Sequence, residues 1–150
     1  SDRTEKIPPP SIGGSWSSRV RLWAAGRDAE SDLITPSWEA RNPCLAAWCE
    51  GPPGAQPPVE TGIELSRKGV LLTALGPNPD GDGLLLRLWE QVGRKEPCTV
   101  RFPTGLTPRR VQPSDLRGRP IGRAIPVENG QVTVPCEPFL PVSLLLAPCS

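Results

Sequence analysis

The stretch VLLTALGPNPDGDGLLLRLWEQ, residues 70–91, decides the fold. Two apolar runs, 70–75 and 84–91, lie on either side of residues 76–83, which are all Gly, Pro, Asn or Asp. These four residue types favour turns, because they adopt unusual φ values or bond their own backbone. Short apolar runs bounded by turn residues are typical of β-strands. The stretch therefore predicts two strands joined by a tight loop.

Further short apolar runs follow the same pattern along the rest of the chain. Turn residues separate runs that are spaced about 8–12 residues apart, which is typical of an all-β sandwich or barrel. We predict an antiparallel β-sandwich. The 21 prolines disfavour helices, and no long window has a strong helical pattern. The other strands are expected at residues 63–65, 98–102, 110–112, 124–127, 131–134 and 139–147.

The clearest turn is Glu128-Asn129-Gly130, which separates two of these predicted strands. Asn and Gly both tolerate positive φ, as the tight turns of β-hairpins require. We therefore expect residues 124–127 and 131–134 to form a hairpin.

The chain divides into two parts by composition, with a boundary near residue 58. Residues 1–58 hold three Pro-Pro runs and four of the five tryptophans, whereas regular strand signals begin at residue 59. Disordered chains are poor in large aromatic residues. We expect residues 1–58 to be irregular, with one or two short strands at 20–24 and 45–48. We expect residues 59–150 to form the C-terminal β-sandwich domain.

The strand at 84–91 is apolar on both faces. Leu84, Leu86 and Leu88 share one side, and Leu85 and Trp89 share the other. A sandwich offers each strand one core face. We therefore expect the Leu85–Trp89 face to be an interdomain surface, covered by residues 1–58, by another domain or by a second copy of the chain. The strand at 139–147 has a similar pattern, with Phe139 and Leu145 opposite its core face.

Charge is balanced overall and uneven locally. The net charge is +1, which gives no general attraction to nucleic acid or to a membrane, and we predict neither as a partner. Residues 28–64 carry seven acids against Arg41, and residues 94–123 carry eight bases against two acids. The two stretches either attract each other within the fold, or the arginine-rich stretch docks an acidic partner.

The sequence contains no convincing motif for catalysis or metal binding. There is no His, and the five cysteines show no Cys-x-x-Cys spacing, so neither a zinc site nor a His-assisted nucleophile is indicated. An odd number of cysteines leaves at least one thiol free unless it pairs between chains. The sequence is compatible with one or two disulfides and does not decide between them. We therefore predict no catalytic, cofactor-binding or metal-binding residue in this chain.

Two residue groups have an alternative interpretation. Asp80 and Asp82 fit turn chemistry, whereas a calcium loop would need a closing Glu that is absent. We interpret the tryptophans of residues 1–58 as side chains that anchor irregular chain by packing. The alternative is that they form a platform on which sugar rings stack. These tryptophans are Trp16, Trp23, Trp38 and Trp48.

From Gly69 onward the chain resembles the C-terminal β-sandwich of glycoside hydrolase family 38, the α-mannosidase family. The residues that carry this resemblance are the strand at 70–75, the Asp80–Gly83 turn, the strand at 84–90 and the closing Pro138–Leu144. The chain departs from the family pattern at Gly76–Pro79 and at Glu90, which suggests a divergent branch.

The resemblance implies a non-catalytic domain of a larger glycoside hydrolase. In this family the zinc ligands and the nucleophile belong to a separate N-terminal catalytic domain, which would be the partner of this chain. The implied role is structural support for that domain and its substrate cleft. The alternatives are an independent carbohydrate-binding module and a protein-interaction module.

Overall fold

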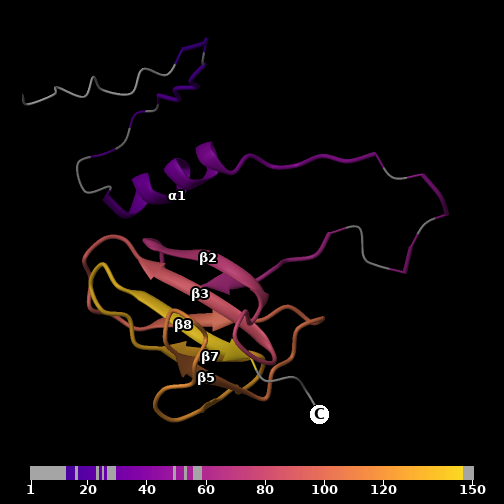
Figure 1. Ribbon diagram of the computed structural model, residues 1–150, viewed down its shortest axis with the longest axis vertical. Coiled ribbons are helices and arrows are strands. Elements are labelled where there is room, and N and C mark those ends of the chain that lie inside the picture. The colour runs from indigo at the N-terminus through magenta and orange to yellow at the C-terminus, as the bar shows by residue number, and fades with distance from the viewer. Residues whose placement is uncertain are drawn as a thin grey trace, which may run out of the picture.

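The computed structural model describes residues 13–15, 17–22, 24, 26, 30–48, 50–52, 54–55 and 59–146. These residues contain two antiparallel sheets and one helix, so the predicted all-β sandwich is confirmed (Figure 1). The smaller sheet has the order β1 (Glu64–Leu65), β4 (Cys98–Arg101) and β7 (Gln131–Val134). The larger sheet has the order β2 (Val70–Pro77), β3 (Leu84–Glu90), β8 (Pro141–Leu146), β5 (Arg110–Ser114) and β6 (Ile125–Pro126).

The core lies between the two sheets and is built by alternation along the strands. Leu86 and Leu88 of β3 are fully buried, as are Val100 of β4 and Leu144 of β8. Burying one such side chain contributes about 1.5–3 kcal/mol relative to leaving it in water. Because the chain has no Met or Tyr, Leu and Val make up most of this core, together with two cysteines and Phe102.

The other face of β3 is covered in part by the chain itself. Leu85 is 7% exposed although it lies outside the core cluster, whereas Trp89 is 46% exposed. Between them, Arg87 donates from Nη2 to the Leu116 carbonyl at 2.6 Å, so the loop after β5 lies over the middle of this face. The expectation that the Leu85–Trp89 face is an interdomain surface stays a prediction. Leu85 is buried without a second domain, and the open part of the face is at Trp89.

Residues 30–41 form a helix, α1 (Glu30–Arg41), next to β2 (Figure 1). The sequence predicted irregular chain there, and that prediction was wrong. Pro36 lies inside the helix, and no continuous apolar stripe marks its length, so the usual helical pattern is missing. At the C-terminal end, the backbone N and Nδ2 of Asn42 donate to the Trp38 carbonyl at 2.9 and 3.1 Å. These bonds satisfy a carbonyl that the helix itself leaves unpaired.

The short strands expected at 20–24 and 45–48 are absent from the described residues of those segments. In the part of the chain that the structure describes, no helix has the length and apolar character needed to cross a bilayer.

The turn at Asn129-Gly130 has the predicted geometry, but the two strands that it connects do not pair with each other. Asn129 and Gly130 have φ values of 51° and 72°, and the backbones of Glu128 and Gln131 exchange two hydrogen bonds of 2.9 and 3.0 Å. Positive φ at both central residues is the mark of a type I′ turn. The predicted hairpin is nevertheless wrong, because β6 pairs with β5 and β7 pairs with β4. The turn carries the chain from one sheet to the other.

The last strand, β8, begins two residues later than predicted. Phe139 has a φ of 58° and belongs to a turn, and the strand starts at Pro141. A non-glycine residue with positive φ interrupts an extended strand. Phe139 and Leu145 therefore do not share a strand face, which corrects the pattern read from the sequence.

Candidate functional site

A buried carboxylate, Glu90, lies at the end of β3. Its side chain is fully buried. Oε1 accepts hydrogen bonds from the backbone N–H groups of Val92 and Arg94, each at 3.2 Å. Oε2 accepts from the backbone N–H groups of Gly93 at 2.8 Å and Phe139 at 2.9 Å. One carboxylate therefore holds together the loop after β3 and the turn before β8.

These hydrogen bonds keep Glu90 ionised. Burial acts to raise the pKa of this carboxyl, but the bonds from Phe139, Arg94, Gly93 and Val92 outweigh burial and hold the pKa below its usual value. Nη1 of Arg67 lies 3.5 Å from Oε1 and supplies a nearby positive charge. A buried charge is tolerated when it is both paired and hydrogen-bonded, and Glu90 meets both conditions.

The turn held by Glu90 presents an exposed aromatic residue. The ring of Phe139 lies so close to Gly93 that a Cβ there would come within 2.6 Å of it, and Gly93 has a φ of 75°, which favours glycine. Trp89 donates from Nε1 to the Phe139 carbonyl at 3.1 Å. The exposed fractions are 46% for Trp89, 63% for Phe139 and 53% for Leu140. We call these three residues the aromatic end surface.

Two thiols are buried near the same charged pair. Cys98 and Cys136 are free and lie in the core, and Cys44 is free and exposed. Burial raises the pKa of the Cys136 thiol, and Cys98 adds to the effect, whereas Arg67 opposes it. Cys98 and Cys136 therefore pack as small apolar groups, and no disulfide forms between these three cysteines. Cys49 and Cys149 lie outside the described residues.

The Asp80–Asp82 loop is held by bonds within the protein. Asp80 forms an ion pair with Arg117, with 2.8 Å between Oδ2 and Nε. Asn78 accepts from the Asp80 backbone at 3.3 Å and donates to the Gly118 carbonyl at 3.3 Å. These bonds agree with the interpretation of Asp80 as a turn residue. Across the described ranges, no three Cys, Asp or Glu side chains are grouped so that they could hold a metal ion.

The comparison with known families agrees with this architecture. Residues 69–140 match the model of the glycosyl hydrolases family 38 C-terminal beta sandwich domain. This segment is a family 38 C-terminal β-sandwich domain. Comparison with curated proteins and with solved structures found no match.

The match to the family 38 sandwich begins one residue before β2 and ends one residue before β8, so it spans Glu90 and the whole aromatic end surface. The domain division expected near residue 58 remains a prediction. The sequence identified Glu90 only as a departure from the family pattern. Nothing in the sequence indicated that Phe139, 49 residues away, would donate to its carboxylate.

Among the described residues, one ion pair joins the acidic and basic stretches of the chain. Arg101 Nε lies 3.6 Å from Glu64 Oε2, where β4 pairs with β1. Arg117 instead pairs with Asp80, which lies outside the acidic stretch. In the part of the chain that the structure describes, the prediction of two mutually attracting charged stretches therefore has support from this exposed pair alone, and such pairs contribute little stability.

Of the four tryptophans of the N-terminal part, the structure describes Trp38 and Trp48, and these two differ in their surroundings. Trp38, on α1, is half-buried and lines a crevice together with Trp89 of the family 38 sandwich. Trp48 is 90% exposed. Trp16 and Trp23 lie outside the described residues. The interpretation as packing anchors therefore applies to Trp38 and not to Trp48.

Proposed function

We propose that this chain is a non-catalytic structural domain of a family 38 glycoside hydrolase, and that it packs against the catalytic domain through the aromatic end surface. The observation that carries the proposal is the conformation of Phe139. A large aromatic residue with a φ of 58° is strained, yet its ring is 63% exposed. Strained backbone tends to occur at functional positions.

The buried carboxylate supports this proposal because it stabilises the strained turn. Glu90 accepts a bond from the Phe139 backbone, and Trp89 donates to the Phe139 carbonyl. A buried charged residue, Glu90, therefore holds the turn that carries the exposed ring of Phe139. Burial of such side chains at an interface contributes about 1.5–3 kcal/mol each, which fits docking on a second domain.

The chemistry of hydrolysis would then belong to the catalytic domain. The family resemblance implies zinc there, bound by residues that this chain does not contain. The described residues offer no grouped ligands for a metal ion, and the chain has no His. We infer that the sandwich supports the substrate cleft from outside and takes no part in bond cleavage.

The variant Phe139→Asn tests the docking role. Asn tolerates positive φ, so the turn and the bond to Glu90 are retained while the ring is removed. We expect the melting temperature to stay the same or rise, and the affinity for a family 38 catalytic domain, supplied as a separate chain, to fall at least tenfold. The measurement is isothermal titration calorimetry.

The matched control is Leu116→Asn, because Leu116 is 61% exposed on the loop after β5. Its affinity should equal that of the unmodified chain. Equal losses for the two variants, or no loss for Phe139→Asn, would contradict docking through the aromatic end surface.

A further inference from the structure

A crevice separates α1 from the larger sheet. It is lined on one side by α1 and residues 19–21, and on the other by Leu71 of β2, Trp89 of β3 and Gln91. Its volume is about 540 Å³. Ligand-binding pockets are usually about 300–1,000 Å³, so the space suits a small ligand of two or three rings. We call it the α1 crevice.

Aromatic rings line the α1 crevice from both sides. Trp38 belongs to α1 and Trp89 to β3, and Leu71 adds an apolar surface beside them. The Trp89 indole is fixed by its Nε1 bond of 3.1 Å to the Phe139 carbonyl. A fixed indole presents a flat apolar face with little further loss of conformational entropy on binding. Such faces fit the apolar faces of sugar rings.

The charge of the α1 crevice is positive. Arg19, Arg21 and Arg41 line it, and the described residues of its lining include no Asp or Glu. Among the described residues, no acidic side chain pairs with any of the three arginines. Each guanidinium therefore has free donors that can form paired bonds with a carboxylate or a sulfate.

From these observations we propose that the α1 crevice binds an oligosaccharide that carries a carboxylate or sulfate group. The two indoles contact the sugar rings, and the arginines bind the anionic group. The membership of residues 69–140 in a glycosyl hydrolase domain family favours a saccharide over an acidic peptide. This site shares Trp89 with the aromatic end surface, and it needs α1 and residues 19–21 in addition to the sandwich.

The test is calorimetric titration of the full 150-residue chain. The probes are an oligogalacturonate, a carrageenan oligosaccharide, mannohexaose and a poly-glutamate peptide. They supply a carboxylated, a sulfated and a neutral sugar, and an acidic chain without sugar. We expect at least one acidic sugar to bind ten times more tightly than mannohexaose and the peptide, with affinity that falls as salt rises. The acidic sugar that binds identifies the anionic group.

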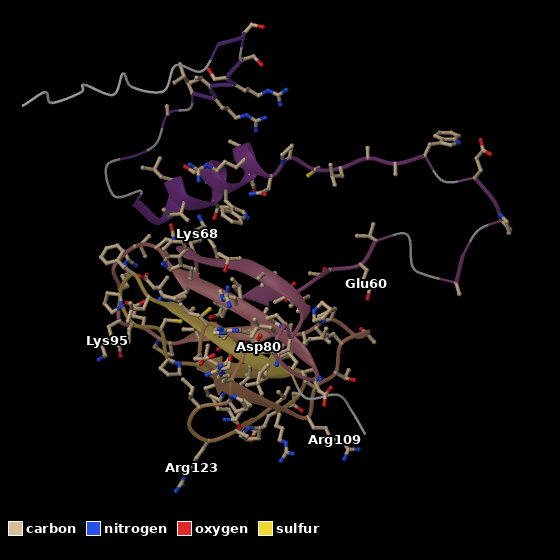
Figure 2. The ribbon with its side chains drawn as sticks, in the orientation of Figure 1. Glu60, Lys68, Asp80, Lys95, Arg109 and Arg123 are labelled. Atoms are coloured by element: carbon tan, nitrogen blue, oxygen red, sulfur yellow. The ribbon has the colours of Figure 1, made fainter. Side chains whose placement is uncertain are left out.

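Two pairs of variants locate the binding. Trp38→Ala and Arg41→Ala should each weaken binding of the acidic sugar about tenfold, which is the usual effect of removing one charge-assisted contact or one stacked ring. Their controls are Trp48→Ala, at an indole that is 90% exposed outside the crevice, and Arg123→Ala. Figure 2 shows Arg123 at the end of the molecule away from α1. Both controls should bind as the unmodified chain does.

Arg41→Lys separates geometry from charge. Lys keeps the positive charge and loses the planar fork, so binding should weaken by an intermediate factor. Absence of acidic-sugar binding, preference for the peptide, or equal losses in the control variants would overturn the proposal. The docking test with Phe139→Asn measures binding to a catalytic domain, whereas this test measures binding to a sugar. The docking proposal and the sugar-binding proposal can therefore fail separately.

Discussion

At Glu90, one carboxylate removed from water accepts four backbone hydrogen bonds and lies beside Arg67. Gln at this position would keep the size of the side chain and lose the charge. Its amide group would then face N–H donors, which leaves buried donors without partners. We expect Glu90→Gln to lower the free energy of unfolding by about 3 kcal/mol at pH 7, measured by urea denaturation.

The pH dependence of Glu90→Gln gives an independent check. The folded pKa of Glu90 lies below that of the unfolded chain. Its contribution is therefore complete above the unfolded value of about 4.3 and is lost as the pH falls through the folded pKa. The stability difference between the two proteins should narrow at about pH 3. A difference that is the same at both pH values would show that the charge has no role.

The sequence predicted little of this residue-scale arrangement. The strand that carries Glu90 was identified from its apolar run, and the position stood out as unusual for the family. Its role depends on Phe139, which is 49 residues away and has a backbone conformation that no local pattern reveals. Partners brought together by the fold are not visible in a window of neighbouring residues.

Among the structural elements, the Asn129-Gly130 turn links the two sheets. Gly130 has a φ of 72°, and a Cβ at that position would meet no neighbouring atom, so the cost of substitution is conformational. Gly130→Val places a β-branched side chain at positive φ and should destabilise the protein by more than about 1 kcal/mol. The control is Gly105→Ala, where φ is not positive and space is open.

Thermal unfolding of the two variants checks this prediction. Gly105→Ala should melt within a few degrees of the unmodified chain, and Gly130→Val should melt clearly below it. If Gly130→Val has an unchanged melting temperature, the turn does not need positive φ.

Most strands were predictable from the sequence, and the connections between them were not. The runs at 70–75 and 84–91 correspond to β2 and β3, because turn residues separate two compact apolar stretches. The helix α1 was missed because Pro36 lies inside it and its apolar residues lack a helical period. The hairpin was misassigned because a type I′ turn fixes a reversal of the chain but not the sheet that each arm joins.

For the whole molecule, the structure leads us to expect no hydrolase activity from the chain on its own. Asp80 forms an ion pair with Arg117 at 2.8 Å, which fits a role in holding its loop. Release of product from an aryl α-mannoside should stay at background with or without added zinc. Turnover that disappears in Asp80→Asn would contradict this expectation.

The sequence predicted the fold of the whole molecule better than its candidate sites. Composition and spacing indicated an all-β sandwich, because the Pro and Gly residues mark the turns. The Trp89 surface was expected from the two-faced pattern of β3. The sequence could not show that α1 would lie across from it and leave a crevice between them.

The position of β8 has a consequence for synthesis on the ribosome. This strand pairs with both β3 and β5, so it is central in space although it is the last strand in the chain. Arg87 and the Ser143 it bonds are 56 residues apart. At about 5–20 residues per second, β3 waits roughly 3–11 s for this neighbour to be translated. During that interval β2 can pair with one edge of β3, but the edge that β8 later covers is unpaired and open to pairing with another chain.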